Sequence, residues 1–127
     1  MDGDLDELNQ LLKSDYAKSI NTFDDMGFTP LMLAAKSGNI KSVRLLIEAG
    51  ADINSHDESK IGNTALSEVA GEASFEMVEV LVKAGADPNI RGWMQLNALD
   101  RAKGRTSIEG RNVFDLLETA AKKFKTL

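Results

Sequence analysis

With 127 residues the chain has the length of one domain, and 15 basic against 20 acidic residues give it a net charge of -5 and a pI of about 4.9. This charge disfavours contact with a phosphate backbone, so we expect no nucleic acid as partner. The chain lacks cysteine, which excludes disulfides and thiolate sites, and no apolar run approaches the roughly 18 residues of a membrane span, so we expect a cytoplasmic protein that binds no membrane.

Residues 3–12 carry leucines at the three- and four-residue spacing of one helix face, at Leu5, Leu8, Leu11 and Leu12. Acidic residues stand at the start of this segment, where a helix dipole favours them. The segment matches the second helix of the unit that follows, but the first helix of its own unit is missing. We therefore interpret residues 1–21 as an N-terminal half-repeat that caps an array.

Residues 22–54 contain the first complete unit, which we predict to be a pair of helices. Thr29 can cap a helix N-terminus, Pro30 suits the first helical position, and Gly38 can take the positive φ that ends the helix. The second helix has one apolar stripe, formed by Ile40, Val43, Leu46 and Ile47. It ends at Gly50. A single unit cannot bury this stripe, so stacking against other copies must supply the core.

The unit recurs twice. A second copy opens at Thr64, 35 residues after Thr29, and a weaker third copy opens at Asn97, 33 residues further on. Glu68 and Arg101 occupy equivalent positions in these two copies. With the copies stacked in register, we expect these two side chains to form an ion pair, which in water would contribute less than about 1 kcal/mol.

The loops between copies depart from a strict repeat. The loop at 55–63 is longer than its counterpart, either because an exposed connector tolerates insertions or because the loop is shaped for a partner. In the third loop Gln95 stands where Gly27 and Gly62 stand earlier, and we expect it to resist a positive φ and to alter the turn. Residues 104–110 are expected to form a long connection before the last helix.

A period of this length with a Thr-Pro-Leu-x-x-Ala opening resembles the ankyrin repeat, which consists of two antiparallel helices and a turn. The resemblance implies an all-α solenoid of stacked helix-turn-helix units with hairpin-like loops. It also implies one domain over residues 1–127, with the half-repeat at 1–21, full repeats at 22–54 and 55–89, and a C-terminal repeat or cap at 90–127.

Ankyrin-like arrays bind macromolecules, usually proteins, through their loop tips and the exposed side of their first helices. The resemblance thus implies a non-enzymatic module, and in so short a chain we expect binding itself to be the activity, by blocking or scaffolding a partner protein. The chain also resembles small stand-alone bacterial ankyrin proteins, some of which are immunity proteins that inhibit a toxin. The alternative is an assembly subunit that forms a homo-oligomer through the same edge; otherwise we expect a monomer when free.

Carried over to this sequence, the partner-binding positions lie at three loop tips and near the ends of the first helices. They are Met26, Phe28, Lys36, Ser37, His56, Glu58, Lys60, Ile61, Asn63, Glu72, Arg91, Trp93, Met94, Leu96 and Arg105. Apolar residues at three successive tips exceed what a solvated edge requires. Trp93, the only tryptophan, is expected to be the main anchor unless it folds back over the third copy.

The residues offer little chemistry. His56, the only histidine, stands beside Asp57 and near Ser55 and Ser59, which are the residue types of a hydrolase triad. Neighbours in one turn seldom have triad geometry, so we expect an exposed loop histidine and no enzyme. Without cysteine, a second histidine, a calcium-loop spacing or a phosphate-binding glycine loop, we expect no metal and no cofactor.

Overall fold

The computed structural model describes residues 20–125, so the expected half-repeat at 1–21 lies almost wholly outside the described residues. The helices in chain order are α2 (Pro30–Lys36), α3 (Ile40–Glu48), α4 (Ala65–Val69), α5 (Phe75–Lys83), the 3-10 helix η2 (Trp93–Gln95), α6 (Ala98–Ala102) and α7 (Ile108–Lys125). The described part of the chain contains no strand, which confirms the all-α prediction. None of its helices is long and apolar enough to cross a bilayer.

The first helix of each unit begins at the polar residue expected to cap it. The Thr29 hydroxyl accepts a hydrogen bond from the Met32 amide at 3.3 Å, and Pro30 follows at the first helical position. Thr64 and Asn97 cap α4 and α6 in the same way. These local bonds satisfy amides that a helix leaves free at its start, so the three helices begin at equivalent places in the repeat.

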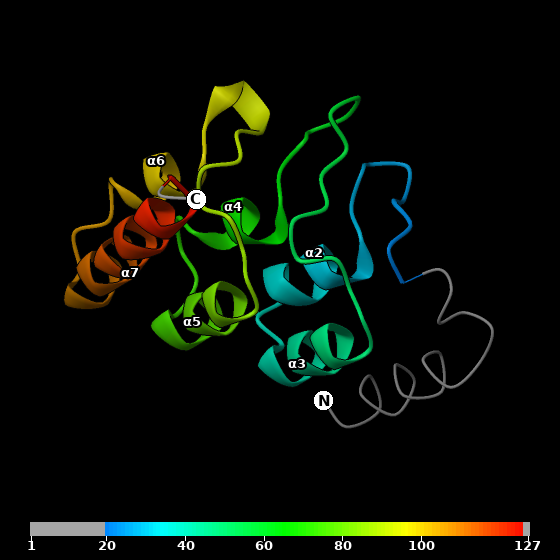
Figure 1. Cartoon of the computed structure of the whole chain (residues 1–127), viewed down its shortest axis with the longest axis horizontal. Coiled ribbons are helices and arrows are strands. Elements are labelled where there is room, and N and C mark those ends of the chain that lie inside the picture. The colour runs from blue at the N-terminus through cyan, green and yellow to red at the C-terminus, as the bar shows by residue number, and fades with distance from the viewer. Residues whose placement is uncertain (1–19, 126–127) are drawn as a thin grey trace.

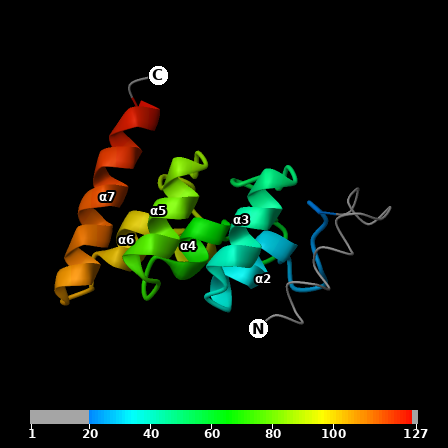
Figure 2. The same ribbon diagram turned by 90° about the horizontal axis from the view of Figure 1, so that it is seen from below.

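The helices form two rows (Figures 1 and 2). In one row α2 packs on α4 and α4 on α6, while α3, α5 and α7 form the second row, which lies below the first in Figure 1. Buried apolar residues from both rows make one continuous core, which includes Leu31, Val43, Leu46, Leu66, Val78, Leu81, Val113 and Leu117. Each unit therefore buries its apolar stripe against its neighbours, as the repeat pattern predicted.

Asparagines at the end of each unit bind the backbone of the next unit. They are Asn21, Asn54 and Asn89. The side chain of Asn54 accepts a hydrogen bond from the Asp87 amide at 2.7 Å and donates one to the Gly85 carbonyl at 3.1 Å. The other two asparagines contact the Asp52 amide (2.7 Å) and the Ala121 carbonyl (3.2 Å), respectively. The stack is thus held by polar bonds between loops as well as by its core.

Replacing Asn54 by alanine is expected to lower the free energy of unfolding by about 1–2 kcal/mol, because two backbone groups of the next unit lose their partner. Urea denaturation followed by circular dichroism measures the effect. Asn112→Ala is a matched control, since Asn112 is exposed on α7. Equal losses in the two variants would show that the contacts between units contribute nothing measurable.

The last helix begins earlier than we expected. The predicted connection over residues 104–110 was wrong at its end, because α7 starts at Ile108 and includes Gly110. The Ser107 hydroxyl accepts a hydrogen bond from the Gly110 amide at 2.9 Å and caps the helix. A Cβ at position 110 would clash with the side chain of Arg105. Gly110 therefore lies inside α7, where its lack of a side chain leaves room for Arg105.

Candidate binding surface

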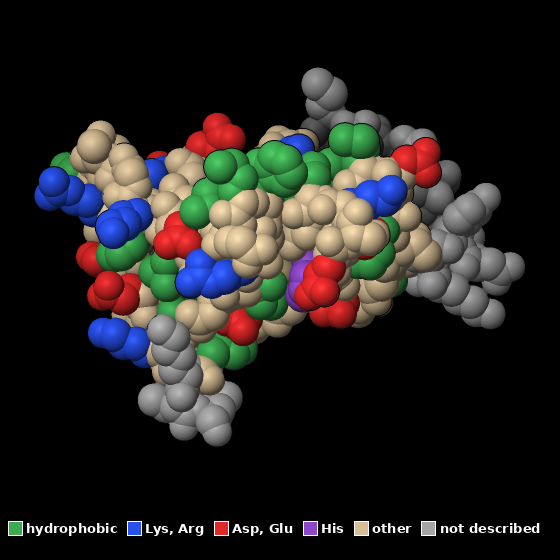
Figure 3. Space-filling model, turned by 90° about the horizontal axis from the view of Figure 1, so that it is seen from above, with side chains coloured by type: hydrophobic (Ala, Val, Ile, Leu, Met, Phe, Trp, Pro, Cys, Tyr) green, Lys and Arg blue, Asp and Glu red, His purple; other side chains and the backbone are tan. Residues whose placement is uncertain are grey.

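The loops at 22–28, 55–63 and 90–96 project from the same side of the stack, which is the upper side in Figure 1. Met26, Trp93 and Met94 expose 59%, 56% and 73% of their surface, and Phe28 and Ile61 are half-buried. Seen from this side, hydrophobic side chains form a row, with charged side chains and the histidine beside it (Figure 3). We call the five apolar residues Met26, Phe28, Ile61, Trp93 and Met94 the tip surface.

Polar contacts beneath the tip surface connect all three units. The Lys36 ammonium lies 4.4 Å from the centroid of the Phe28 ring and 3.2 Å from Glu68 Oε1. Glu68 Oε2 accepts a hydrogen bond from Asn63 Nδ2 at 2.7 Å, and Asn63 Oδ1 accepts one from the Trp93 amide at 2.9 Å. Because Asn63 is buried, its role is to position the third loop, and direct contact with a partner is not expected of it.

The predicted ion pair between Glu68 and Arg101 was wrong. Glu68 pairs with Lys36 of the preceding unit, and Arg101 Nη2 lies 3.4 Å from both Asn63 Oδ1 and the Trp93 carbonyl oxygen. In-register stacking does bring the two helices together, as expected. The Asn63 amide, however, binds Glu68 through its nitrogen and Arg101 through its oxygen, so one polar side chain links both.

The turn of the third loop also differs from our expectation. Gln95 adopts a φ of +62° and Met94 a φ of +60°, although neither is glycine. The turn nevertheless keeps its backbone bonds, from the Gln95 amide to the Gly92 carbonyl at 2.9 Å and from the Gly92 amide to the Leu96 carbonyl at 3.0 Å. Arg91 Nη1 donates to the Gln95 carbonyl at 2.7 Å. These bonds hold a left-handed conformation that glutamine otherwise avoids.

Gln95→Gly is expected to raise the free energy of unfolding by about 0.5–1 kcal/mol, because glycine takes the same φ without steric cost. We expect this gain from relieved strain to exceed the stability that is lost because glycine raises the conformational entropy of the unfolded chain. Lys103→Gly is the control, since Lys103 has a φ of -58° and should lose stability on the same change. Thermal melting of both variants measures the difference; a loss in both would mean that residue 95 is unstrained.

An open cleft of about 700 Å³ lies between the second and third loops. The loops approach each other closely at Gly62 and Gly92, because a Cβ on Gly92 would lie 2.8 Å from the Gly62 carbonyl oxygen. Lys60 lines one side of the cleft, and Arg91 and Trp93 line the other. The tip surface therefore has a hollow with an apolar wall and cationic side chains at its edge.

The residues that resemble a hydrolase triad do not form one. His56 Nδ1 lies 3.0 Å from the Asn54 carbonyl oxygen, and Nε2 lies 3.4 Å from Glu58 Oε1. The Ser59 hydroxyl instead donates to Asp57 Oδ1 at 2.6 Å, and this bond is the main reason that the pKa of Asp57 lies below its usual value. Among the described residues, no three histidine or acidic side chains are grouped so that they could hold a metal ion.

A family model described as ankyrin repeats in three copies matches residues 1–92 of the chain. The chain belongs to the ankyrin repeat family. Ankyrin repeats are protein-protein interaction modules, and the family is generally not enzymatic. The matched residues include the helix pairs α2 and α3, and α4 and α5, while α6 and α7 follow the match and continue the same two rows of helices.

Two curated relatives cover parts of this ankyrin chain. A protein of Acanthamoeba polyphaga mimivirus that is named for its ankyrin repeats is 47% identical over 45 residues, which are 35% of this chain and 24% of that protein. The human DNA-binding protein RFXANK is 44% identical over 66 residues, which are 51% of this chain and 24% of that protein. The chain therefore matches only about a quarter of the length of each relative.

Not all positions carried over from the ankyrin resemblance face the tips. The Arg105 side chain turns toward the preceding unit, where Nη1 donates to the Ala73 carbonyl at 2.8 Å and the Ala70 carbonyl at 3.3 Å. The Ser37 hydroxyl donates to the Ala34 carbonyl of its own helix at 2.9 Å. These two groups already have partners within the chain. The remaining exposed polar positions are Lys36, Glu58, Lys60, Glu72 and Arg91, while His56 and Leu96 are half-buried.

Sequence reasoning missed Leu33, which exposes 47% of its surface on α2. Leu33 occupies the position that Glu68 and Arg101 take in the next two ankyrin units. The charged residues at these equivalent positions were the available signal that Leu33 is not a core residue, although Glu68 and Arg101 are themselves only partly exposed. Phe23 in the first loop, 40% exposed, was missed as well, and its sequence neighbourhood gave no comparable signal.

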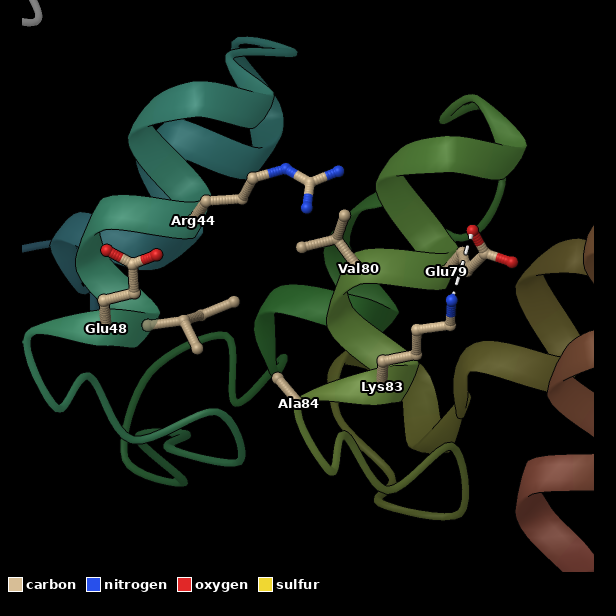
Figure 4. A pocket seen from close by; sticks show the side chains of 7 residues that line it. Arg44, Glu48, Glu79, Val80, Lys83 and Ala84 are labelled. Atoms are coloured by element: carbon tan, nitrogen blue, oxygen red, sulfur yellow. Dashed lines mark ion pairs between the residues drawn. The ribbon is translucent and has the colours of Figure 1, made fainter.

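A second hollow, of about 300 Å³, lies between the outer helices α3 and α5 of this ankyrin stack. Arg44 reaches across it toward Val80, and Glu79 and Lys83 lie on its far side (Figure 4). Its charged groups pair locally, Arg44 with Glu76 at 3.5 Å and Lys83 with Glu79 at 3.8 Å. The groove separates consecutive outer helices and exposes no large apolar side chain, so the tip surface is the stronger candidate.

Proposed function

We propose that the chain is a non-enzymatic binding module that holds a partner protein on its tip surface and thereby blocks or scaffolds it. The observation that carries the proposal is the exposure of Met26 at the tip of the first loop and of Trp93 and Met94 at the tip of the third, which leaves large apolar side chains in water. The contacts through Lys36 and Asn63 support it, because they hold the loops in place before any partner arrives. Such preorganisation lowers the entropic cost of binding.

A protein is a better partner for this chain than a nucleic acid. The net charge of -5 repels a phosphate backbone, and Asp24, Asp25, Asp57 and Glu58 add four carboxyl groups to the first two loops. RFXANK is named as a DNA-binding protein, but the region that it shares with this chain is a quarter of its length. We therefore propose contact with a protein surface.

The specific case that we propose is an immunity-type inhibitor of a toxin. A preorganised surface without catalytic groups can inhibit an enzyme by covering its active site, and the small array offers such a surface. In this case, a captured partner should be toxic when expressed alone, and co-expression of this chain should restore growth. Restoration by the wild-type chain and failure of Trp93→Ala would support inhibition at the tip surface, whereas a non-toxic partner would favour scaffolding.

The general proposal is tested by affinity capture from the source cell followed by mass spectrometry. Three baits are compared: the wild-type chain, a tip variant with Trp93→Ala and Met94→Ser, and a control with Glu48→Ala and Lys83→Ala on the outer face. A protein retained by the wild type and the control but lost by the tip variant supports the proposal. Retention by all three baits would place the contact elsewhere on the chain.

The assembly alternative is separated by size-exclusion chromatography with light scattering. A monomer that forms a complex only with the captured protein supports a binding module. A homo-oligomer that Trp93→Ala and Met94→Ser convert to a monomer would instead show that the same edge joins copies of this chain.

A further inference from the structure

We propose that the cleft between the second and third loops receives an acidic side chain of an extended partner segment, with a neighbouring apolar side chain packed on Trp93. This inference rests on the proposed function and specifies the chemistry of the partner. Lys60 is the residue that would determine this specificity, and Arg91 faces the same cleft from the opposite loop.

The charges around the cleft favour a carboxylate. Lys60 and Arg91 supply two cations, and Glu58 is the only carboxylate among the described residues that line the cleft. Glu58 lies beside His56, with 3.4 Å between its Oε1 and the imidazole Nε2. A partner carboxylate would therefore meet the Lys60 ammonium and the Arg91 guanidinium, of which Arg91 already contacts Asp100, whereas a partner ammonium would find one carboxylate, Glu58.

The Lys60 ammonium is available for a partner. It forms no ion pair with any residue that the structure describes, although its charge helps to lower the pKa of Asp57, after the stronger effect of the Ser59 hydroxyl. The Asp57 carboxylate is already bound by the hydroxyl and amide of Ser59, at 2.6 and 3.0 Å. Arg91 differs from Lys60, since its Nη1 lies 3.5 Å from Asp100 Oδ2.

The stem of Lys60 is held in place by the first loop. A Cβ built on Gly27 would lie 2.7 Å from the Cβ of Lys60, so the two loops pack against each other at this point. On the other side of the cleft, Asn63 fixes the Trp93 backbone through the 2.9 Å hydrogen bond. The cationic and the aromatic side of the cleft thus have defined positions, which is what recognition of an acidic residue next to an apolar one requires.

The test uses random linear peptides displayed on phage, selected against the wild-type chain and counter-selected against Trp93→Ala. Enriched peptides are expected to contain Asp or Glu close to an aromatic or branched apolar residue. Binding of an enriched peptide is then measured by titration with Lys60→Glu and with Lys41→Glu, an equal charge reversal at an exposed position of α3. We expect Lys60→Glu to weaken binding about tenfold or more and Lys41→Glu to leave it within about twofold.

A reciprocal change gives the sharpest outcome. Replacing the acidic residue of the peptide by lysine should abolish binding to the wild type and restore part of it with Lys60→Glu, because the charges are then exchanged. Enriched peptides that are basic or uncharged but still need Trp93 would overturn the acidic specificity and leave the proposed function intact. If the peptides enriched on the wild type are all lost in the counter-selection, because they bind Trp93→Ala equally well, the binding site lies elsewhere, which would contradict the proposed tip surface itself.

Discussion

Leu46→Ala is expected to lower the free energy of unfolding by roughly 2–5 kcal/mol, the range found when a buried leucine is truncated. Leu46 lies on the inner face of α3, exposes only 2% of its surface and belongs to the continuous core. Alanine leaves a cavity at that place, and the neighbouring helices can close it only in part because they are fixed by further contacts between units. Urea denaturation followed by circular dichroism measures the loss.

Lys41→Ala provides the comparison on the same helix, because Lys41 is exposed and lies off the apolar stripe. Its truncation should change stability by less than about 0.5 kcal/mol. A similar loss in both variants would mean that the face of α3 assigned to the core is wrong. A broad transition in Leu46→Ala would instead show that the units of the array unfold separately.

Trp93→Ala is expected to weaken binding of the partner protein by at least about thirtyfold while shifting the melting temperature little. Trp93 exposes 56% of its surface, so truncation removes little buried area from the free chain. In a complex the indole would be covered, and interface residues of this kind contribute most when they are central and rigid. The Asn63 bond to its backbone supplies that rigidity before binding.

Two measurements distinguish this role from a structural one. In the free chain, the tryptophan emission should be that of a water-exposed indole, and it should shift to shorter wavelength when the partner is added. A blue-shifted emission without partner, together with a large loss of stability in Trp93→Ala, would show that Trp93 is packed in the core and has a structural role. Met94→Ala is a useful second variant, because Met94 is even more exposed but lacks the large aromatic surface.

The candidate surface was predicted in outline from the sequence. Met26, Trp93 and Met94 were assigned to loop tips because each falls in the connector between two copies, and the structure exposes them there. Arg105 was assigned to the same surface by its place at the end of a helix. Its guanidinium instead binds the Ala73 carbonyl of the preceding unit, and nothing in the local sequence specifies a bond between residues 32 positions apart.

The sequence by itself determined the repeated unit, because the signals for it are local. Thr29, Thr64 and Asn97 cap helices through bonds to an amide three residues further on, and the apolar stripe around Val43 and Leu46 follows from helical spacing. Stacking followed as well, since a unit with one unburied stripe needs a neighbour.

Only the tertiary structure decided how the side chains of neighbouring units pair and how the third loop turns. Glu68 forms its ion pair with Lys36 of the preceding unit and not with Arg101 of the following unit. The Asn63 amide binds Glu68 through its nitrogen and Arg101 through its oxygen, so it links these two side chains in place of an ion pair. Gln95 takes its positive φ because the hydrogen bonds of the turn outweigh its intrinsic preference. Both outcomes depend on distances between segments that are far apart in the chain, and a residue pattern read along one chain does not contain those distances.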